Sequence, residues 1–479
     1  MISIDEYAKY DGLGLAELVA KKEVTPQELA DTALAAVERV HPKLNAVLQR
    51  LPEEARAAIA RGVPEGPFRG VPFLIKELVL HAKGVRLDSG CKLAQGFVPK
   101  EDTELMARFR RAGLVLVGTT QTPELGYNPT TETTLYGPVH NPWDPARSAG
   151  GSSGGSGAAV AAGIVPVAHA NDGGGSIRIP ASCNGLVGLK PTRDRIPTGP
   201  DYADPLCGLA IEFAVSRSVR DTAALLDAVA GPDPGAPSVC VPPARPFREE
   251  LAAKPGRLRI AFSTRPVSGR RADPECERAV LETAKLLESL GHEVLEDAPR
   301  YDWDRFLDTV HVIWTAFTAL SMDGLAGALG RTPTPDSVEA VTWKCYEDGK
   351  RFSALDLLAA LDHHNAVSRQ VAPFFQDVDA FLTPTLARPP APLGEIDQNK
   401  AGLSAIDWTR QVFEYVPFTA LYNTTGQPAI SLPLHFTPQN VPIGVQFAGR
   451  FGEESTLLRL ASQLEQARPW RDKRPGLHV

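Results

Sequence analysis

Two clusters of glycine and serine, separated by a run of small apolar residues, constrain this chain more than any other part of it. The first cluster occupies residues 148–157, the second residues 173–176, and the run between them reads AAVAAGIVPVAHA. A glycine- and serine-rich stretch on its own is typical of a flexible linker. Here the intervening run is apolar and almost uncharged, which indicates a helix and a strand packed in a core. We therefore interpret both clusters as structured parts of one fold.

Helical and strand patterns alternate on both sides of these clusters. Thr25-Pro26-Gln27-Glu28 combines an N-cap, a proline at the first helical position and a capping-box glutamate, which predicts the start of a helix. Short apolar runs predict buried strands at 70–78, 114–120, 258–263, 379–385, 428–434 and 443–449, with helices at 103–111, 219 onward, 274–290, much of 303–378 and 454 onward. Because no low-complexity linker interrupts this series, we predict an α/β fold with a single large domain over residues 1–479.

Composition and charge exclude several classes of protein. The chain has 479 residues, 43% of them hydrophobic and 22% charged, which is ordinary globular usage. Its net charge is −7 with both signs interspersed, so we expect no nucleic-acid partner. The six cysteines lack short spacings and are interpreted as reduced thiols. No signal peptide or membrane span is evident, so we expect a cytoplasmic protein. The adjacent His363 and His364 point to different helix faces, so we expect no metal site.

The glycines do not match the known phosphate-binding loops. A P-loop needs lysine where Ser156 stands, and a dinucleotide fingerprint beginning at Gly173 needs glycine where Arg178 stands. A kinase-type glycine loop needs downstream HRD and DFG motifs, which are absent. A serine-hydrolase elbow centred on Ser153 is formally present, but that elbow follows a buried strand, and the preceding NPWDPARSAG has no apolar run.

The second cluster has a different chemical use, because Gly173, Gly174 and Gly175 directly precede Ser176. Consecutive glycines let successive backbone N–H groups turn toward one point. Such donors stabilise the oxygen that becomes negative when a carbonyl group is attacked. The segment is therefore either an oxyanion hole joined to a nucleophile or a tight glycine turn with a surface serine.

A nucleophilic serine needs a base, and the residue types offer one candidate. His169 lies in the apolar run and is interpreted as a core histidine. Lys76 ends the apolar run VPFLI, which would carry its amine into the interior, where desolvation lowers the pKa of a lysine. The alternative is a lysine that reaches solvent from the end of a strand.

Several segments in fixed order resemble the amidase signature family. They include VPFLIKEL, GGSSGGSGAAVAAG, DGGGSIRIPA, CNGLVGLKPT, FTALYNTTGQPAISLP and PIGVQFAG, and the resemblance covers nearly the whole chain. It implies an amidase signature fold, with a central mixed β-sheet flanked by helices and a catalytic core at about residues 70–200. It also implies hydrolysis of a carbon–nitrogen bond without a metal or organic cofactor.

The same resemblance assigns roles to individual residues. Lys76 is the implied general base, Ser152 a bridging serine that follows a cis peptide, and Ser176 the nucleophile. The implied oxyanion hole is formed by backbone N–H groups from Gly173, Gly174 and Gly175 to Ser176. The implied supporting hydrogen bonds come from Ser153, Asp172 and Arg178.

The substrate is the least constrained part of this prediction. Ala170-Asn171-Asp172-Gly173 departs from the commonest family pattern and resembles the branch that includes the nylon-oligomer cyclic-dimer hydrolases. We expect a small, neutral, largely apolar linear or cyclic amide, because no charged cluster falls in the expected pocket. Six residues could line that pocket, although each is interpreted first as plain core: Tyr127, Tyr136, Cys207, Trp314, Trp343 and Phe413.

Three other functions stay open at this point. Esters and carbamates present the same carbonyl to the same serine, so esterase or urethanase activity is one alternative. A second is the glutaminase subunit of a tRNA-dependent amidotransferase, although that subunit usually has glutamine where Ile179 stands. A third is a catalytically silent binding module, against which the intact Lys76, Ser152 and Ser176 argue. The sequence is compatible with a homodimer.

Overall fold

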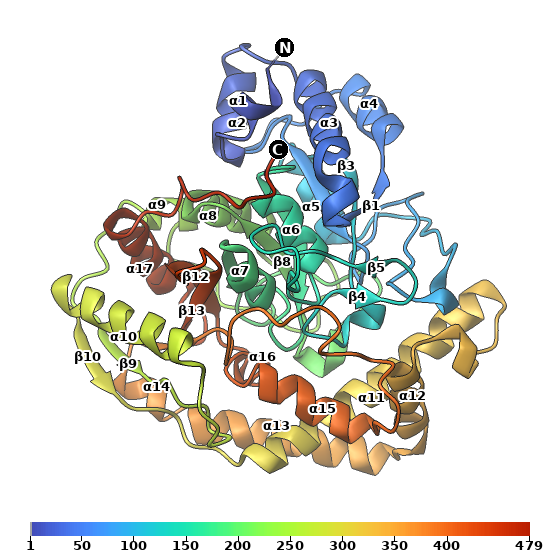
Figure 1. The fold of residues 1–479 in the computed structure, drawn as a ribbon, viewed down its shortest axis with the longest axis vertical. Coiled ribbons are helices and arrows are strands. Elements are labelled where there is room, and N and C mark those ends of the chain that lie inside the picture. Colours follow the sequence, from blue (N-terminus) through green and yellow to red (C-terminus); the bar gives the residue numbers. More distant parts are fainter. Residues whose placement is uncertain (1) are drawn as a thin grey trace.

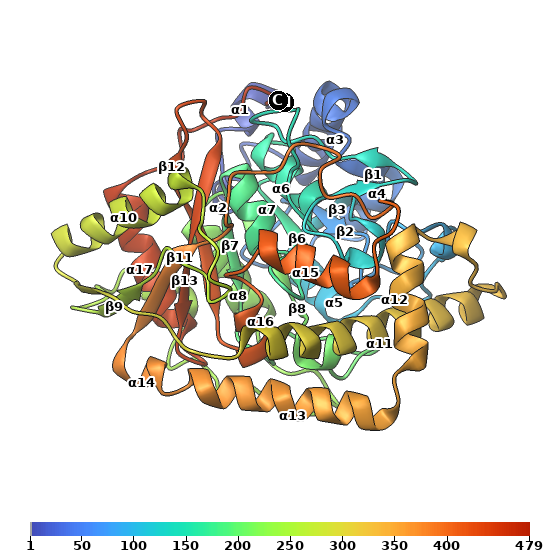
Figure 2. The same cartoon turned by 60° about the horizontal axis from the view of Figure 1, so that its bottom comes forward.

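An 11-stranded mixed β-sheet runs through the molecule in the order β1-β3-β2-β6-β8-β7-β12-β13-β11-β9-β10. The computed structural model describes residues 2–479 (Figures 1 and 2). The strands of the sheet are β1 (Val47–Arg50), β2 (Pro72–Lys76), β3 (Val115–Thr120), β6 (Val167–Asp172), β7 (Val187–Lys190), β8 (Ile211–Ser216), β9 (Arg259–Phe262), β10 (Glu293–Glu296), β11 (Ala380–Pro384), β12 (Ala429–Phe436) and β13 (Pro442–Gly449). A separate small sheet pairs β4 (Glu132–Thr133) with β5 (Gly137–Pro138).

Both halves of the chain contribute to this one sheet. Strand β2 pairs in parallel with β3 and β6, and β6 pairs antiparallel with β8. Strand β12 joins β7 to β13, and the far edge, with β11, β9 and β10, is again parallel. The predicted α/β fold with a central mixed sheet in one domain is therefore confirmed.

Helices pack around the sheet. They are α1 (Ile4–Tyr7), α2 (Gly12–Ala20), α3 (Pro26–Leu44), α4 (Pro52–Ala60), α5 (Glu104–Arg111), α6 (Gly154–Ala161), α7 (Arg178–Asn184), α8 (Val219–Val229), α9 (Phe247–Glu250), α10 (Pro274–Ser289), α11 (Trp303–Leu329), α12 (Ala340–Arg351), α13 (Ala354–Val371), α14 (Phe374–Asp377), α15 (Ala405–Tyr415), α16 (Leu421–Thr425) and α17 (Glu454–Ala467). Short 3₁₀ turns are η1 (Lys92–Ala94), η2 (Glu124–Gly126), η3 (Pro205–Gly208) and η4 (Pro335–Ser337).

Local sequence signals account for where many of these elements begin. The capping box of Thr25 and Glu28 is formed in both directions at the start of α3. The small apolar run between the two glycine clusters folds into α6 and β6, as predicted, and every residue of both elements is buried. Gly155 lets α6 approach the sheet closely, because a Cβ there would lie 2.5 Å from the backbone nitrogen of Gln121.

Helix α11 is long and apolar enough to cross a membrane by length and composition. It packs against α12, α13 and α15, and Figure 2 shows it running alongside α13 at the lower edge of the molecule. Its buried face includes Phe306, Val310 and Trp314. These contacts account for its apolar residues within the fold.

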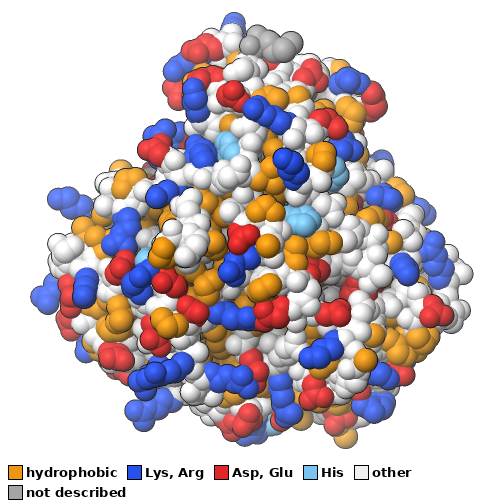
Figure 3. Space-filling model, in the orientation of Figure 1, with side chains coloured by type: hydrophobic (Ala, Val, Ile, Leu, Met, Phe, Trp, Pro, Cys, Tyr) orange, Lys and Arg blue, Asp and Glu red, His pale blue; other side chains and the backbone are white. Residues whose placement is uncertain are grey.

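Acidic and basic side chains are interspersed over the face of the molecule that Figure 3 shows, with apolar side chains scattered among them.

Candidate active site

Lys76 is the last residue of β2, a strand whose five residues are all buried. Its Nζ donates to Ser152 Oγ at 2.7 Å and to Asn171 Oδ1 at 2.5 Å. The side chain is 0% exposed, and the alternative in which it reaches solvent is therefore wrong. The structure brings together the lysine and one of the two serines that the sequence pointed to.

The charge state of Lys76 follows from this burial. Desolvation lowers the pKa of Lys76 from an ordinary value of 10.5 to about 7, although the negative charges of Glu212 and Asp172 act in the opposite direction. A large share of Lys76 is consequently an uncharged amine near neutral pH. An uncharged amine with a hydroxyl group 2.7 Å away is able to accept a proton from it.

Ser152 follows a cis peptide bond, Gly151–Ser152, as the family resemblance implies. Its neighbour Ser153 links this turn to β6: Ser153 Oγ donates to the carbonyl of Asn171 at 3.2 Å and lies 3.3 Å from the Asn171 N–H. Asn171, in β6, in turn contacts Lys76. Polar contacts therefore join the turn at Ser152 and Ser153 to both β6 and β2.

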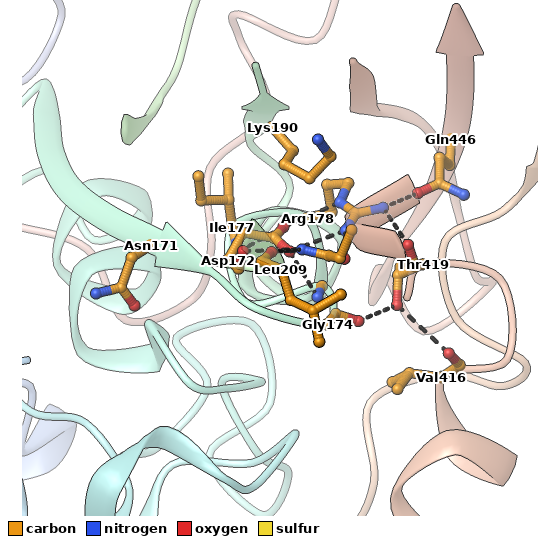
Figure 4. A network of polar contacts seen from close by, with 12 residues as sticks. Asn171, Asp172, Gly174, Ile177, Arg178, Lys190, Leu209, Val416, Thr419 and Gln446 are labelled. Carbon is orange, nitrogen blue, oxygen red and sulfur yellow. Dashed lines mark hydrogen bonds and ion pairs between the residues drawn. The ribbon is translucent and has the colours of Figure 1, made fainter. Parts of the chain in front are cut away.

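Asp172 and Arg178 hold the glycine turn before Ser176 (Figure 4). Arg178 Nε and Nη2 donate to the two carboxylate oxygens of Asp172 at 2.9 and 2.8 Å, and both side chains are 0% exposed. Burial raises the pKa of Asp172, but the charge and hydrogen bonds of Arg178 and a hydrogen bond from Asn423 outweigh it and lower that pKa to about 2. Arg178 Nη1 also donates to Thr419 and Gln446, both at 2.7 Å.

One residue of the triple-glycine turn has a backbone conformation that only glycine adopts readily. Gly175 has φ +138°, and a Cβ there would lie 2.5 Å from Thr419 Oγ1. That hydroxyl donates to the carbonyl of Gly174 at 2.6 Å, which fixes the turn. The turn ends at Ser176, which is 7% exposed.

One of the predicted oxyanion donors is already engaged. The N–H of Gly175 donates to Asp172 Oδ1 at 2.7 Å, so it does not point to a substrate, and the prediction is corrected there. Within residues 2–479 no partner is found for the N–H groups of Gly173, Gly174 or Ser176. Those three donors stay available.

Ser152 and Ser176 line the same cavity, whose volume is about 400 Å³. Most of its wall is apolar and includes Leu78, Leu87 and Phe97. A cavity of about 20 Å³ adjoins Ser176 as well, lined by Tyr127, Trp314, Phe413 and Val416 among others. A further cavity of about 440 Å³, between the N-terminal helices and the C-terminal segment, contains neither serine.

The six aromatic and cysteine side chains predicted for a pocket divide into two groups. Trp314 lines both cavities beside Ser176, and Tyr127 and Phe413 line the smaller one. Tyr136, Cys207 and Trp343 line neither of these cavities. Tyr136 donates to Asp88, and Trp343 donates to Glu347 on the exposed face of α12. The prediction that Tyr136, Cys207 and Trp343 could line the pocket is therefore wrong.

One residue that lines the site was not identified from the sequence. Glu212 lies in β8 directly opposite Asn171, is 2% exposed and lines the larger cavity. It contacts His169 at 2.6 Å, and His169 accepts from the Lys76 N–H at 3.2 Å. His169 is a core histidine, as interpreted. Glu212 reaches the site because β6 pairs with β8, and no local sequence pattern specifies that pairing.

No group of three or more histidine, cysteine, aspartate or glutamate side chains suited to a metal ion is found in residues 2–479.

Known proteins place this arrangement in a family. A family model described as Amidase matches residues 28–458. The chain belongs to the amidase signature family. It is an amidohydrolase that acts on carbon–nitrogen bonds other than peptide bonds, as the sequence motifs implied.

This amidase is similar to several characterised proteins over its whole length. A 6-aminohexanoate-cyclic-dimer hydrolase of Paenarthrobacter ureafaciens is 39% identical over 480 residues, which cover 98% of this chain and 96% of that one. A solved structure of 6-aminohexanoate cyclic dimer hydrolase complexed with substrate superimposes with a TM-score of 0.94 at 37% identity, covering 98% of this chain and all of the other. A bacterial aryl acylamidase superimposes with a TM-score of 0.86 at 25% identity, covering 99% of each chain.

Proposed function

We propose that this amidase hydrolyses a neutral, largely apolar amide, linear or cyclic, through an acyl-enzyme formed on Ser176. One observation carries the proposal: the buried amine of Lys76 contacts Ser152 at 2.7 Å, and Ser152 shares a cavity with Ser176. The apolar wall of that cavity favours an apolar substrate. The similarity to cyclic-dimer hydrolases supports a cyclic amide among the candidates.

In the first half of the reaction, the uncharged Lys76 accepts a proton from Ser152 as Ser152 accepts one from Ser176. The Ser176 oxygen forms a bond to the amide carbonyl carbon, and the carbonyl oxygen becomes negative. The N–H groups of Gly173, Gly174 and Ser176 are the donors that would receive that oxygen. Asp172 and Arg178 hold the turn in the shape this requires.

In the second half, the proton on Lys76 returns through Ser152 to the leaving nitrogen. This step is essential because an amide anion is a very poor leaving group. The carbon–nitrogen bond then breaks and leaves an ester on Ser176. Water, deprotonated through the same relay, attacks that ester, and the Ser176 hydroxyl is restored with release of the carboxylic acid.

Carbamate and ester hydrolysis would use the same residues, because these groups present the same carbonyl. For the glutaminase alternative, the relevant position is Ile179, whose side chain lines the small cavity beside Ser176. An apolar side chain there gives no hydrogen bond to a glutamine amide. We therefore rank glutaminase activity below hydrolysis of an apolar amide.

A substrate panel with a nucleophile variant tests the proposal. We expect the purified chain to hydrolyse a cyclic diamide or an anilide faster than glutamine, and a serine-directed sulfonyl fluoride to label Ser176 in mass spectrometry. Ser176→Ala should abolish turnover and labelling while its unfolding midpoint stays near that of the wild type. Labelling of a different serine, or turnover of glutamine alone, would contradict the proposal.

A further inference from the structure

Two polar groups in the wall of the larger cavity have no partner within residues 2–479. They are Glu212 Oε1 and Trp314 Nε1, and both atoms are shielded from solvent. Buried polar atoms in folded proteins nearly always have a hydrogen-bond partner, so each of these needs an explanation. The reaction described above uses neither atom.

The Glu212 carboxylate is held in a fixed orientation. His169 Nδ1 accepts from the backbone N–H of Lys76, so the ring proton resides on His169 Nε2 and is donated to Glu212 Oε2 at 2.6 Å. The other oxygen, Oε1, has no partner within residues 2–479, and Glu212 lines a cavity whose wall is mostly apolar. A carboxylate oxygen in that position can only accept a hydrogen bond.

The Trp314 indole is also held in place by its neighbours. Its ring stacks on Tyr127 with centroids 4.3 Å apart and an interplanar angle of 14°. Its six-membered ring also lies against Gly173, where a Cβ would be 2.9 Å from Cζ2. Trp314 lines both cavities beside Ser176, and its Nε1 can only donate.

We propose that Glu212 and Trp314 form a subsite for a second, non-reacting amide group of the substrate. Glu212 Oε1 accepts the N–H of that group, and Trp314 Nε1 donates to its carbonyl oxygen. The inference rests on the proposed function, because it requires the substrate of Ser176 to occupy this cavity. It makes the pair specificity-determining residues for a diamide.

The composition of the cavity favours an amide over other groups. An ester supplies an acceptor for Trp314 but no donor for Glu212, and a carboxylate would be repelled by Glu212. An ammonium group satisfies Glu212 alone. Asp201 is another carboxylate that lines the cavity, and it already contacts His81 at 2.6 Å. A secondary amide is a neutral group whose N–H and carbonyl oxygen would satisfy both unpaired atoms.

The test compares substrates that share one scissile amide and differ in the second group. The set has a secondary amide, the matching ester, a methylene chain and a terminal ammonium in that position. For the wild type we expect kcat/KM to be about 10-fold or more higher for the diamide than for the ester or methylene compound.

Two conservative variants then assign the preference to residues. Glu212→Gln keeps an oxygen for His169 and presents an N–H to the cavity, so it should lower the diamide-to-ester ratio by about 10-fold. Trp314→Phe keeps the aromatic ring and should lower the diamide-to-methylene ratio by about 5-fold to 10-fold. Trp343→Phe is the matched control, because its indole donates to Glu347 far from the cavity and its loss should leave both ratios unchanged.

The ratios separate this subsite from a role of Glu212 in the relay. Glu212 also carries charge close to Lys76, so Glu212→Gln should change the pH profile with every substrate. An equal loss on diamide and ester would mean that Glu212 acts only through Lys76, and would overturn the subsite while leaving the acyl-enzyme in place. A preference for the ammonium substrate that Trp314→Phe does not alter would also overturn it. Failure of the wild type to turn over any compound of the set would instead contradict the proposed function.

Discussion

Lys76 and Lys190 are the two lysines in residues 2–479 that are completely buried, and their surroundings differ in one decisive respect. Each is the last residue of a central strand, β2 or β7. Lys76 Nζ contacts a serine hydroxyl that opens to a cavity, whereas Lys190 Nζ donates to the carbonyl of Pro191 at 2.7 Å. Figure 4 shows Lys190 beside Arg178, away from Asn171, which is the residue that contacts Lys76.

The pKa of both lysines is lowered, and for the same main reason. Burial lowers the pKa of Lys76 to about 7, and burial together with the positive charge of Arg178 lowers that of Lys190 well below its ordinary value. Two lysines with a lowered pKa therefore lie in one sheet, and of the two only Lys76 contacts a hydroxyl group that it could deprotonate. A lowered pKa makes a lysine available as a base, but its hydrogen-bond partner decides whether it can act as one.

The largest expected difference between the two lysines is in catalysis. Lys76→Ala removes the proton acceptor for Ser152, so we expect kcat/KM to fall by at least about 10³-fold. The measurement is turnover of the best substrate by purified variant and wild type with matched circular dichroism spectra. Retention of most activity would mean that Lys76 is not the base.

The lowered pKa of Lys76 also affects the stability of the protein. In the unfolded chain Lys76 has an ordinary pKa of 10.5 and in the folded chain about 7, so folding disfavours its charged form. The cost is complete below pH 7 and disappears as pH rises to 10.5, which amounts to on the order of 5 kcal/mol.

Lys76→Met removes this cost. Relative to the wild type, the variant should therefore be most stable at pH 6 and lose that advantage by pH 10.5. Urea denaturation of both proteins at the two pH values measures the change. A stability difference that does not vary with pH would show that the folded lysine keeps its ordinary pKa.

Arg178, the cation beside Lys190, depends on a paired carboxylate. Asp172→Asn leaves the guanidinium buried without its charge partner, which should destabilise the protein by about 3–5 kcal/mol in urea denaturation. The exposed pair of Lys344 and Glu347 provides the control, because Glu347→Gln should cost less than about 1 kcal/mol. Similar losses from the two substitutions would contradict the assigned importance of the buried pair.

The pH dependence of the reaction gives a smaller effect. Because Lys76 must be uncharged to accept a proton, kcat/KM should rise with pH through about 7 and then level off. About one pH unit below that value the rate should be roughly 10-fold below its plateau. A profile that is flat between pH 5.5 and 8.5 would rule out a lysine that titrates in this range.

The sequence led to Lys76 and Ser176 through local signatures, a buried apolar run and a triple-glycine turn, and to Ser152 through the resemblance to the amidase signature family. It also located the main helices and strands, since caps and apolar periodicity are local. Glu212 was missed because its place beside Asn171 depends on the register of β6 against β8, which no local pattern specifies.

Side-chain direction limited the prediction in the same way. Tyr136 and Trp343 are aromatic residues in segments that looked variable, and nothing in their own sequence neighbourhood shows that they point away from the cavity. Gly175 illustrates the limit at the backbone level. Its N–H was predicted as an oxyanion donor, yet the turn directs it to Asp172.

Lys190→Met should have the smallest effect on turnover, and for that reason it sharpens the comparison most. Methionine is one heavy atom shorter than lysine and close to it in volume, and the one hydrogen bond that is lost, to Pro191, is local. We expect kcat/KM to stay within about 3-fold of the wild type. At pH 10.5, the ordinary pKa of lysine, the free energy of unfolding should change by less than about 1 kcal/mol, because burial of the amine then costs little stability. If Lys190→Met instead abolished turnover as Lys76→Ala should, the amine of Lys190 would have to be part of the proton path. Its hydrogen bond to a backbone carbonyl would then not distinguish it from Lys76, and the comparison between the two lysines would fail.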